Sequence, residues 1–181
     1  MPTYKFKRLT YLYQSEVKLM IDQAEEEWLK SLISFLYLFG ARISEALKLT
    51  REQFKIEGDY VTVTIGILKR HSDTGPITPS HILTVNKKSP FVKILVKYIE
   101  SKPLGEKLWI QHRGHVWRKI KALNDKCSPH FFRHTRLWKL AEKGASEAVL
   151  MDWAGWTDPR PAGRYIKATG RLASQFADKI D

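Results

Sequence analysis

The C-terminal half of the chain carries side chains that could hold a phosphate and attack it. His130 and Arg133 lie close together, Trp156 follows Gly155, and Tyr165 is the first tyrosine after them. Guanidinium, imidazole and indole groups can donate hydrogen bonds to phosphate oxygens, and a phenol can act as a nucleophile. We therefore interpret this stretch as suited to phosphoryl transfer.

A further arginine stands much earlier, between two apolar segments. Arg42 follows Gly40 and precedes the short segment 43–49. An arginine buried there would be costly without an anion beside it. Pairing with Glu45 or exposure to solvent would explain Arg42 equally well from the local sequence.

The periodicity of the apolar residues predicts mostly helices with one hairpin between them. Segment 60–68 alternates β-branched residues, a polar and basic turn follows, and 76–85 resumes a strand pattern, which favours a small antiparallel sheet with Lys69 near its turn. The expected fold is therefore α+β, mainly α-helical with this small sheet. Helices are expected at 14–24, 25–39, 43–49, 91–100, 115–126, 130–143 and 147–153, with Tyr165 in a further helical piece.

Ser128 and Pro129 predict the start of the helix that carries His130 and Arg133. Residues three apart share a helix face. The first turn also offers unpaired N–H groups and a positive dipole end, both of which favour an anion.

The charge of the chain favours a polyanionic partner. Its 181 residues carry a formal net charge of +12, which points to nucleic acid before an anionic membrane. A single cysteine excludes an internal disulfide and a cysteine-based zinc finger, and we expect neither metal nor cofactor. No apolar run approaches the length of a membrane span. We expect a protein of the cytoplasm of a prokaryotic cell or of a virus or plasmid host, associated with DNA.

Together these residues make the chain resemble the tyrosine recombinases, or phage-type integrases. Each box alone is weak, but their order and spacing around a helix–hairpin–helix pattern are specific. The matching boxes are Gly40-Ala-Arg42-Ile-Ser-Glu45-Ala-Leu47, His130-Phe-Phe-Arg133-His-Thr135, Gly155-Trp156 and Tyr165.

The resemblance implies a role for each matching residue. Tyr165 would attack phosphorus and form a 3′-phosphotyrosyl link, while Arg42 and Arg133 would hold the phosphate. His130 would contact the phosphate and exchange a proton with the tyrosine, Trp156 would contact the phosphate, and Lys69 would protonate the leaving 5′ oxygen. Glu45 would support an arginine. The basic residues expected along the DNA are Arg70, Arg118, Lys119, Lys121 and Arg136.

The resemblance also implies an organisation and a partner. We expect a single catalytic domain over 1–181, with an entering arm at 1–12, a core at 13–165, a helix or tail at 166–181, and no N-terminal core-binding domain. Double-stranded DNA, bound by a homo-oligomer that is a tetramer, is the expected partner. Two alternatives stay open, namely DNA relaxation like that of type IB topoisomerases, and DNA binding without cutting.

Overall fold

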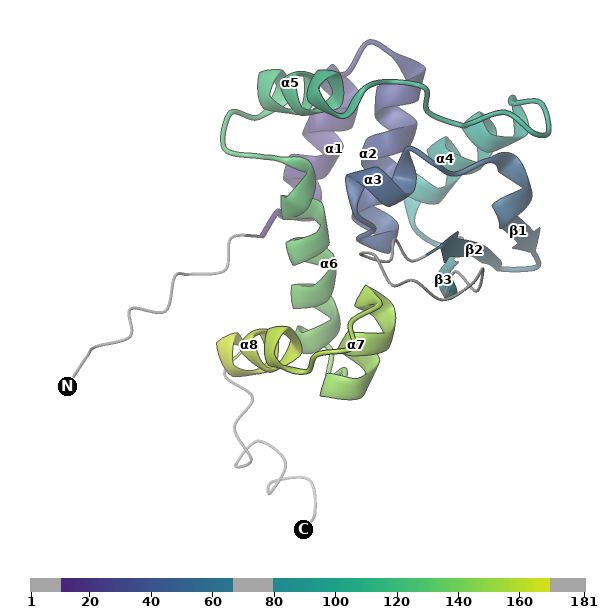
Figure 1. The fold of residues 1–181 in the computed structure, drawn as a ribbon. Helices are drawn as coiled ribbons and strands as arrows, with labels where there is room; N and C mark the ends of the chain where they lie inside the picture. The colour runs from purple at the N-terminus through teal and green to yellow at the C-terminus, as the bar shows by residue number, and fades with distance from the viewer. Residues whose placement is uncertain (1–10, 67–79, 170–181) are drawn as a thin grey trace, which may run out of the picture.

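Eight α-helices and a three-stranded antiparallel sheet make up the described part of the protein. The computed structural model describes residues 11–66 and 80–169 (Figure 1). Its elements run in the order α1 (Gln14–Gln23), α2 (Glu27–Phe39), α3 (Ile43–Ala46), η1 (Arg51–Gln53), β1 (Phe54–Glu57), β2 (Tyr60–Gly66), β3 (Ser80–Asn86), α4 (Pro90–Glu100), α5 (Arg113–Leu123), α6 (Pro129–Glu142), α7 (Glu147–Ala154) and α8 (Arg160–Ala168). The mainly helical α+β fold predicted from the sequence is confirmed.

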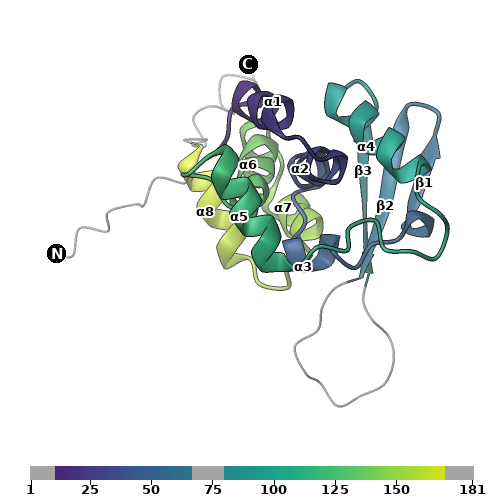
Figure 2. The same cartoon turned by 90° about the horizontal axis from the view of Figure 1, so that it is seen from above.

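Helix α2 is the centre of the fold. Its residues from Ser31 to Phe39 are all buried, as expected for a helix that is apolar on most of its circumference. It packs against α1, α4 and α6. Figure 2 shows α2 between the sheet with α4 on one side and α6 on the other.

The sheet has the order β1-β2-β3. Val61, Val63 and Ile65 of β2 point inward, and so do Leu83 and Val85 of β3, whereas intervening residues such as Thr64 and Ile82 are exposed. This alternation is what one buried sheet face requires. Strand β1 was not predicted, because four residues of alternating pattern before the turn at Gly58 give a weak signal.

Helices α3 and α5 both end about three residues before their predicted ends. The expected helix at 43–49 ends at Ala46, because Lys48 and Leu49 donate to the carbonyls of Glu45 and Ala46 and tighten the chain. Helix α5 begins at Arg113, where the ring of His112 accepts from Gly114, and it ends at Leu123 because Asn124 is extended. Lys126 therefore lies beyond the helix.

Helix α6 lies unusually close to the end of α2 at Gly40. This glycine ends α2 with φ +64, and a Cβ atom there would be 2.8 Å from the Cβ of Arg136. A side chain at position 40 would meet both a left-handed backbone and the neighbouring helix. Gly40 thus allows α6, which carries Arg133, to approach the end of α2, two residues before Arg42.

We predict that Gly40→Ala destabilises the protein much more than Gly58→Ala. Both glycines have positive φ, but a Cβ at Gly58 would meet nothing within 4 Å. Backbone strain should cost about 1 kcal/mol at Gly58, and added overpacking should bring the loss at Gly40 to about 3 kcal/mol. Urea unfolding measures both values, and equal losses would show that the close approach of α6 is not needed.

Candidate active site

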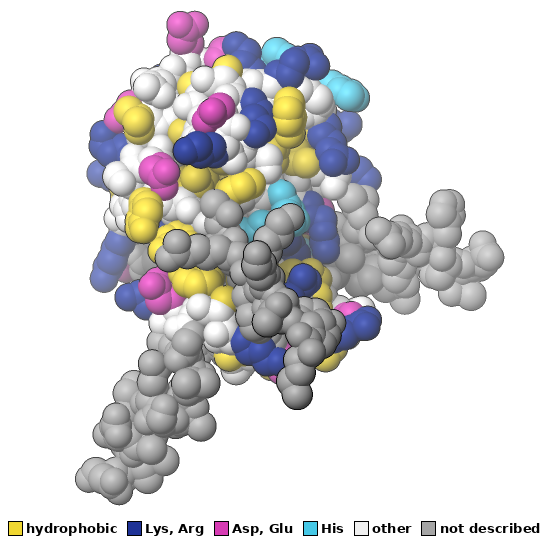
Figure 3. Space-filling view, turned by 90° about the vertical axis from the view of Figure 1, so that its left-hand side faces the viewer, with side chains coloured by type: hydrophobic (Ala, Val, Ile, Leu, Met, Phe, Trp, Pro, Cys, Tyr) yellow, Lys and Arg dark blue, Asp and Glu magenta, His cyan; other side chains and the backbone are white. Residues whose placement is uncertain are grey.

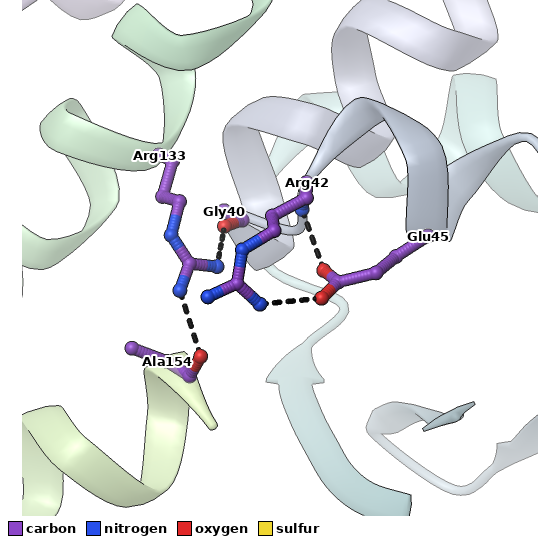
Figure 4. Close-up of polar contacts among 5 residues, drawn as sticks. All are labelled: Gly40, Arg42, Glu45, Arg133 and Ala154. Atoms are coloured by element: carbon purple, nitrogen blue, oxygen red, sulfur yellow. Dashed lines mark hydrogen bonds and ion pairs between the residues drawn. The ribbon is translucent and has the colours of Figure 1, made fainter. Parts of the chain in front are cut away.

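Arg133 is buried and connects the ends of two helices. It is 3% exposed, and its two terminal nitrogens donate to the carbonyls of Gly40 (3.0 Å) and Ala154 (2.7 Å) (Figure 4). These carbonyls close α2 and α7, where helices leave unpaired acceptors and a negative dipole end. Burial, and then the charge of Arg42, lowers the pKa of Arg133 to about 10, so the side chain keeps its charge at neutral pH.

Arg42 approaches the same place from the start of α3. Glu45, which is buried, accepts from the backbone N–H of Arg42 and from its guanidinium, each at 2.7 Å. Figure 4 shows the guanidiniums of Arg42 and Arg133 next to each other. Both local interpretations of Arg42 apply, since this side chain is paired with Glu45 and is also partly exposed. Both guanidiniums have further N–H groups beyond these contacts, enough to hold an anion between them.

Trp156 and Tyr165 complete the cluster. The guanidinium of Arg133 lies over the indole of Trp156 at 5.5 Å, and the rings of Trp156 and Tyr165 are stacked with centroids 6.1 Å apart. Gly155 places Trp156 there by ending α7 in the left-handed conformation. The structure therefore brings Arg42, Arg133, Trp156 and Tyr165 together within one chain.

Tyr165 lies in a second, smaller hydrophobic core formed by α6, α7 and α8. It is 4% exposed and packs with Leu137, Ala141, Leu150 and other residues of these helices. Burial raises the pKa of its phenol to about 12, so the free protein holds it protonated.

His134 is a site residue that the sequence reasoning missed. Its Nδ1 is 2.5 Å from the hydroxyl oxygen of Tyr165. His130 instead is exposed, and its ring lies edge-on against that of His134 at 4.4 Å. The spacing of His130 and His134 on α6 shows that both share one helix face, but it does not show which of them reaches the tyrosine.

His81 on β3 is a second residue that the sequence reasoning missed. It points inward, is 8% exposed, and neither ring nitrogen has a hydrogen-bond partner among the described residues. Burial lowers its pKa, and the nearby charges include Glu45 and Arg133. The strand pattern of 76–85 could have indicated that position 81 faces inward, beside the arginines.

The structure describes only some of the remaining predicted residues. Lys69 and Arg70 fall outside the described residues. Arg118 is exposed, whereas Lys119 pairs with Glu26 and Lys121 donates to the carbonyl of Asp125. Figure 3 shows Lys and Arg side chains distributed over the side formed by α5, α6 and α8, with a few acidic ones among them.

Arg136 is packed against its neighbours. Its guanidinium lies over the ring of Trp153 at 4.5 Å, and burial lowers its pKa. Trp153 in turn donates to the carbonyl of Phe39 at 2.7 Å. Through these contacts Arg136 helps to pack α6 against α7 and the end of α2.

The described residues offer no group of three or more His, Cys, Asp or Glu side chains that could hold a metal ion. Within the same residues, no helix is long and apolar enough to cross a membrane.

We predict that Glu45→Gln destabilises the protein by about 2 kcal/mol, the value of hydrogen bonds to a charged group. The amide can accept one hydrogen bond from Arg42, but its NH2 group faces the other donor. Glu57→Gln is the matched control, because Glu57 and its partner Lys55 are both well exposed, and it should change stability by less than about 0.5 kcal/mol. Urea unfolding tests both, and similar losses would contradict the role of Glu45.

We predict that acid destabilises the wild type more than His134→Gln. Burial, and then the charges of His130 and Arg133, lowers the pKa of His134 from 6.5 to about 4. Between these values the unfolded chain takes up a proton that the folded protein refuses, so the free energy of unfolding falls as the pH falls. Urea midpoints from pH 7 to pH 4.5 should decline less steeply in the variant, and parallel curves would contradict the shift.

Comparison with protein families places these features in a known group. A profile of the Phage integrase family matches residues 10–171. The chain is 25% identical over 207 residues to the "Prophage ps2 probable integrase" of Lactococcus lactis subsp. lactis (strain IL1403), covering 94% of this chain and 54% of that protein. It is 24% identical over 179 residues to a "Tyrosine recombinase" of Pseudothermotoga lettingae, covering 94% and 60%. The chain thus spans a little over half the length of these relatives.

Solved structures show the same fold. The XerH site-specific recombinase in a post-cleavage complex with its palindromic difH substrate superposes with a TM-score of 0.70 at 17% identity, covering 97% of this chain and 54% of that one. The catalytic domain of bacteriophage HP1 integrase gives a TM-score of 0.65 at 17% identity, with 88% of each chain covered. From the match over residues 10–171 and this shared fold, we conclude that the chain belongs to the phage integrase family.

Proposed function

We propose that this chain cuts and rejoins DNA at a specific site through a covalent link between Tyr165 and a 3′ phosphate. The observation that carries the proposal is that Arg42 and Arg133 lie side by side in a chain that also places Tyr165 next to them, across the ring of Trp156. Two guanidiniums can neutralise a phosphodiester, and a phenol beside them can attack it.

In this mechanism the arginines bind the two non-bridging oxygens of the phosphate. They stabilise the additional negative charge that develops as the tyrosine oxygen approaches phosphorus. Because their positions are fixed by Glu45 and by the carbonyls of Gly40 and Ala154, little reorganisation is needed at that moment. Trp156 supplies one further N–H donor, and His130 stands ready to contact the phosphate from the exposed side of α6.

Lys69 is proposed as the acid that protonates the leaving 5′ oxygen, with Arg70 close to the DNA backbone. The phosphotyrosyl link retains the energy of the broken phosphodiester. A 5′ hydroxyl from another strand can therefore reverse the reaction and join to a new partner, with no need for ATP or a metal ion.

Double-stranded DNA is the proposed partner. The net charge of +12 and the basic side chains on the face with α5, α6 and α8 support it. Among the structural neighbours, XerH and the Tn1549 transposon integrase are both described in complex with DNA. We propose that the protein acts as a tetramer on its DNA site. We also propose that it acts in the cytoplasm of a prokaryotic host, with residues 1–181 as its catalytic domain.

We predict that the wild-type chain captures DNA covalently and that Tyr165→Phe does not. The substrate is a pool of nicked duplexes with randomised sequence around the nick, so that the short 5′ fragment diffuses away after cleavage. DNA that stays attached to the protein under denaturing conditions is sequenced, which also identifies the site. Tyr60→Phe is the matched control, because Tyr60 is an exposed tyrosine on the sheet, and it should capture DNA like the wild type.

The reaction is distinguished from its alternatives by two further results. Relaxation of a supercoiled plasmid that lacks the selected site would indicate a topoisomerase. Capture that persists in Tyr165→Phe would show that another residue is the nucleophile. Tight DNA binding by the wild type without capture from any member of the pool would indicate a DNA-binding protein that does not cut.

A further inference from the structure

The hydroxyl of Tyr165 already has a partner that can take its proton. His134 of α6 lies directly after Arg133, and its Nδ1 is 2.5 Å from the phenol oxygen of α8. Because the raised pKa of Tyr165 keeps the phenol protonated, the phenol donates this hydrogen bond and Nδ1 accepts it. The ring is then the neutral tautomer with its hydrogen on Nε2.

The surroundings of His134 keep it neutral. Burial lowers its pKa to about 4, and the electrostatic effects of His130, Arg133 and Arg164 act in the same direction. Of these, His130 and Arg133 belong to α6 and Arg164 to α8. At neutral pH the imidazole is therefore uncharged, and the lone pair on its Nδ1 faces the hydroxyl of Tyr165 and can accept the proton.

The other described site residues are less suited to this task. Arginine cannot accept a proton at physiological pH, and the indole of Trp156 is a donor without an acceptor. His130 is exposed and lies against the ring of His134, without a hydrogen bond to Tyr165 among the described contacts. The geometry thus favours His134 over His130, to which the resemblance assigned proton exchange.

We propose that His134 is a catalytic residue that accepts the proton of Tyr165 during DNA cleavage, an inference that rests on the proposed function. As the tyrosine oxygen bonds to phosphorus, the bond from phosphorus to the 5′ oxygen breaks. The phenolic proton passes to Nδ1 of His134, and the 5′ oxygen takes a proton from an ammonium group, the role proposed for Lys69. During rejoining, the 5′ hydroxyl bonds to phosphorus and returns its proton to the amine, while the bond from phosphorus to the tyrosine oxygen breaks and that oxygen takes its proton back from His134.

Binding of the substrate strengthens this base. A phosphodiester held by Arg42 and Arg133 places a negative charge near His134 and offsets the cations around it, which raises the pKa of the imidazole. His134 is thus a weak base in the free protein and a stronger one when a phosphate is in place. Tyr165 is thereby activated when DNA is bound.

The test compares two substitutions with different chemistry. In His134→Gln the amide oxygen can accept the hydrogen bond from Tyr165 but cannot take its proton, whereas His134→Ala leaves space for imidazole from the buffer. The single-turnover rate of covalent capture should fall about 10²-fold or more in both. Imidazole should restore part of the rate to His134→Ala and none to His134→Gln. His112→Gln, at the exposed start of α5, is the control and should cleave like the wild type.

The wild-type rate should also fall in acid as His134 becomes protonated, and this acid limb should be missing from the pH profile of His134→Gln. DNA binding, measured by gel shift, should persist in both variants. A His134→Gln rate equal to that of the wild type would overturn the proposal. Equally slow variants without rescue by imidazole would assign His134 a packing role and also overturn it.

A measurement without DNA separates this inference from the proposed function. Nitrogen NMR of the histidine rings in the free protein should show His134 with its proton on Nε2 and a pKa far below 6.5. A ring protonated on Nδ1 at neutral pH would overturn the proposal even if the wild type captures DNA. Failure of the wild type to capture any DNA would instead count against the proposed function.

Discussion

The site depends on the two hydrogen bonds that the guanidinium of Arg133 donates to the carbonyls of Gly40 and Ala154. Burying a guanidinium is costly unless its donors are satisfied, and here the ends of α2 and α7 supply the acceptors. The same contact therefore ties two helices together and holds a positive charge where a phosphate can reach it. A lysine at this position would keep the charge, but its single nitrogen lacks the planar fork that reaches both carbonyls.

Further contacts hold the end of α2 against α6 and α7. Gly40 lets α6 approach the end of α2, Trp153 donates to the carbonyl of Phe39, and Arg136 packs over the ring of Trp153. Glu45 orients Arg42 from the other side. The side chains proposed to bind the phosphate are thus held by Glu45 and by backbone carbonyls at helix ends. They are already in position without a bound ligand.

Much of this arrangement could be predicted from the sequence. The apolar pattern indicated the buried α2, and the resemblance to the tyrosine recombinases implied that Arg42, Arg133, Trp156 and Tyr165 meet. Side-chain partners far apart in the chain could not be predicted. Lys119 pairs with Glu26, and nothing in either local sequence indicates this. His134 was missed because helical spacing puts it on the same face as His130 without showing which ring contacts α8. Strand β1 was too short to stand out, and the assignment of Lys69 stays a prediction.

The separate core around Tyr165 has a consequence for cooperativity. Most of the buried residues belong to the cluster centred on α2, whereas α8 packs in a smaller cluster with residues of α6 and α7. A segment with so little buried surface opens at a lower free energy than the whole molecule does. We therefore expect the amide hydrogens of α8 to exchange through local opening, and those of α2 to exchange only on global unfolding. Opening of α8 alone would leave the contacts of Arg42 with Glu45 and of Arg133 with Gly40 and Ala154 in place, because none of these partners lies in α8.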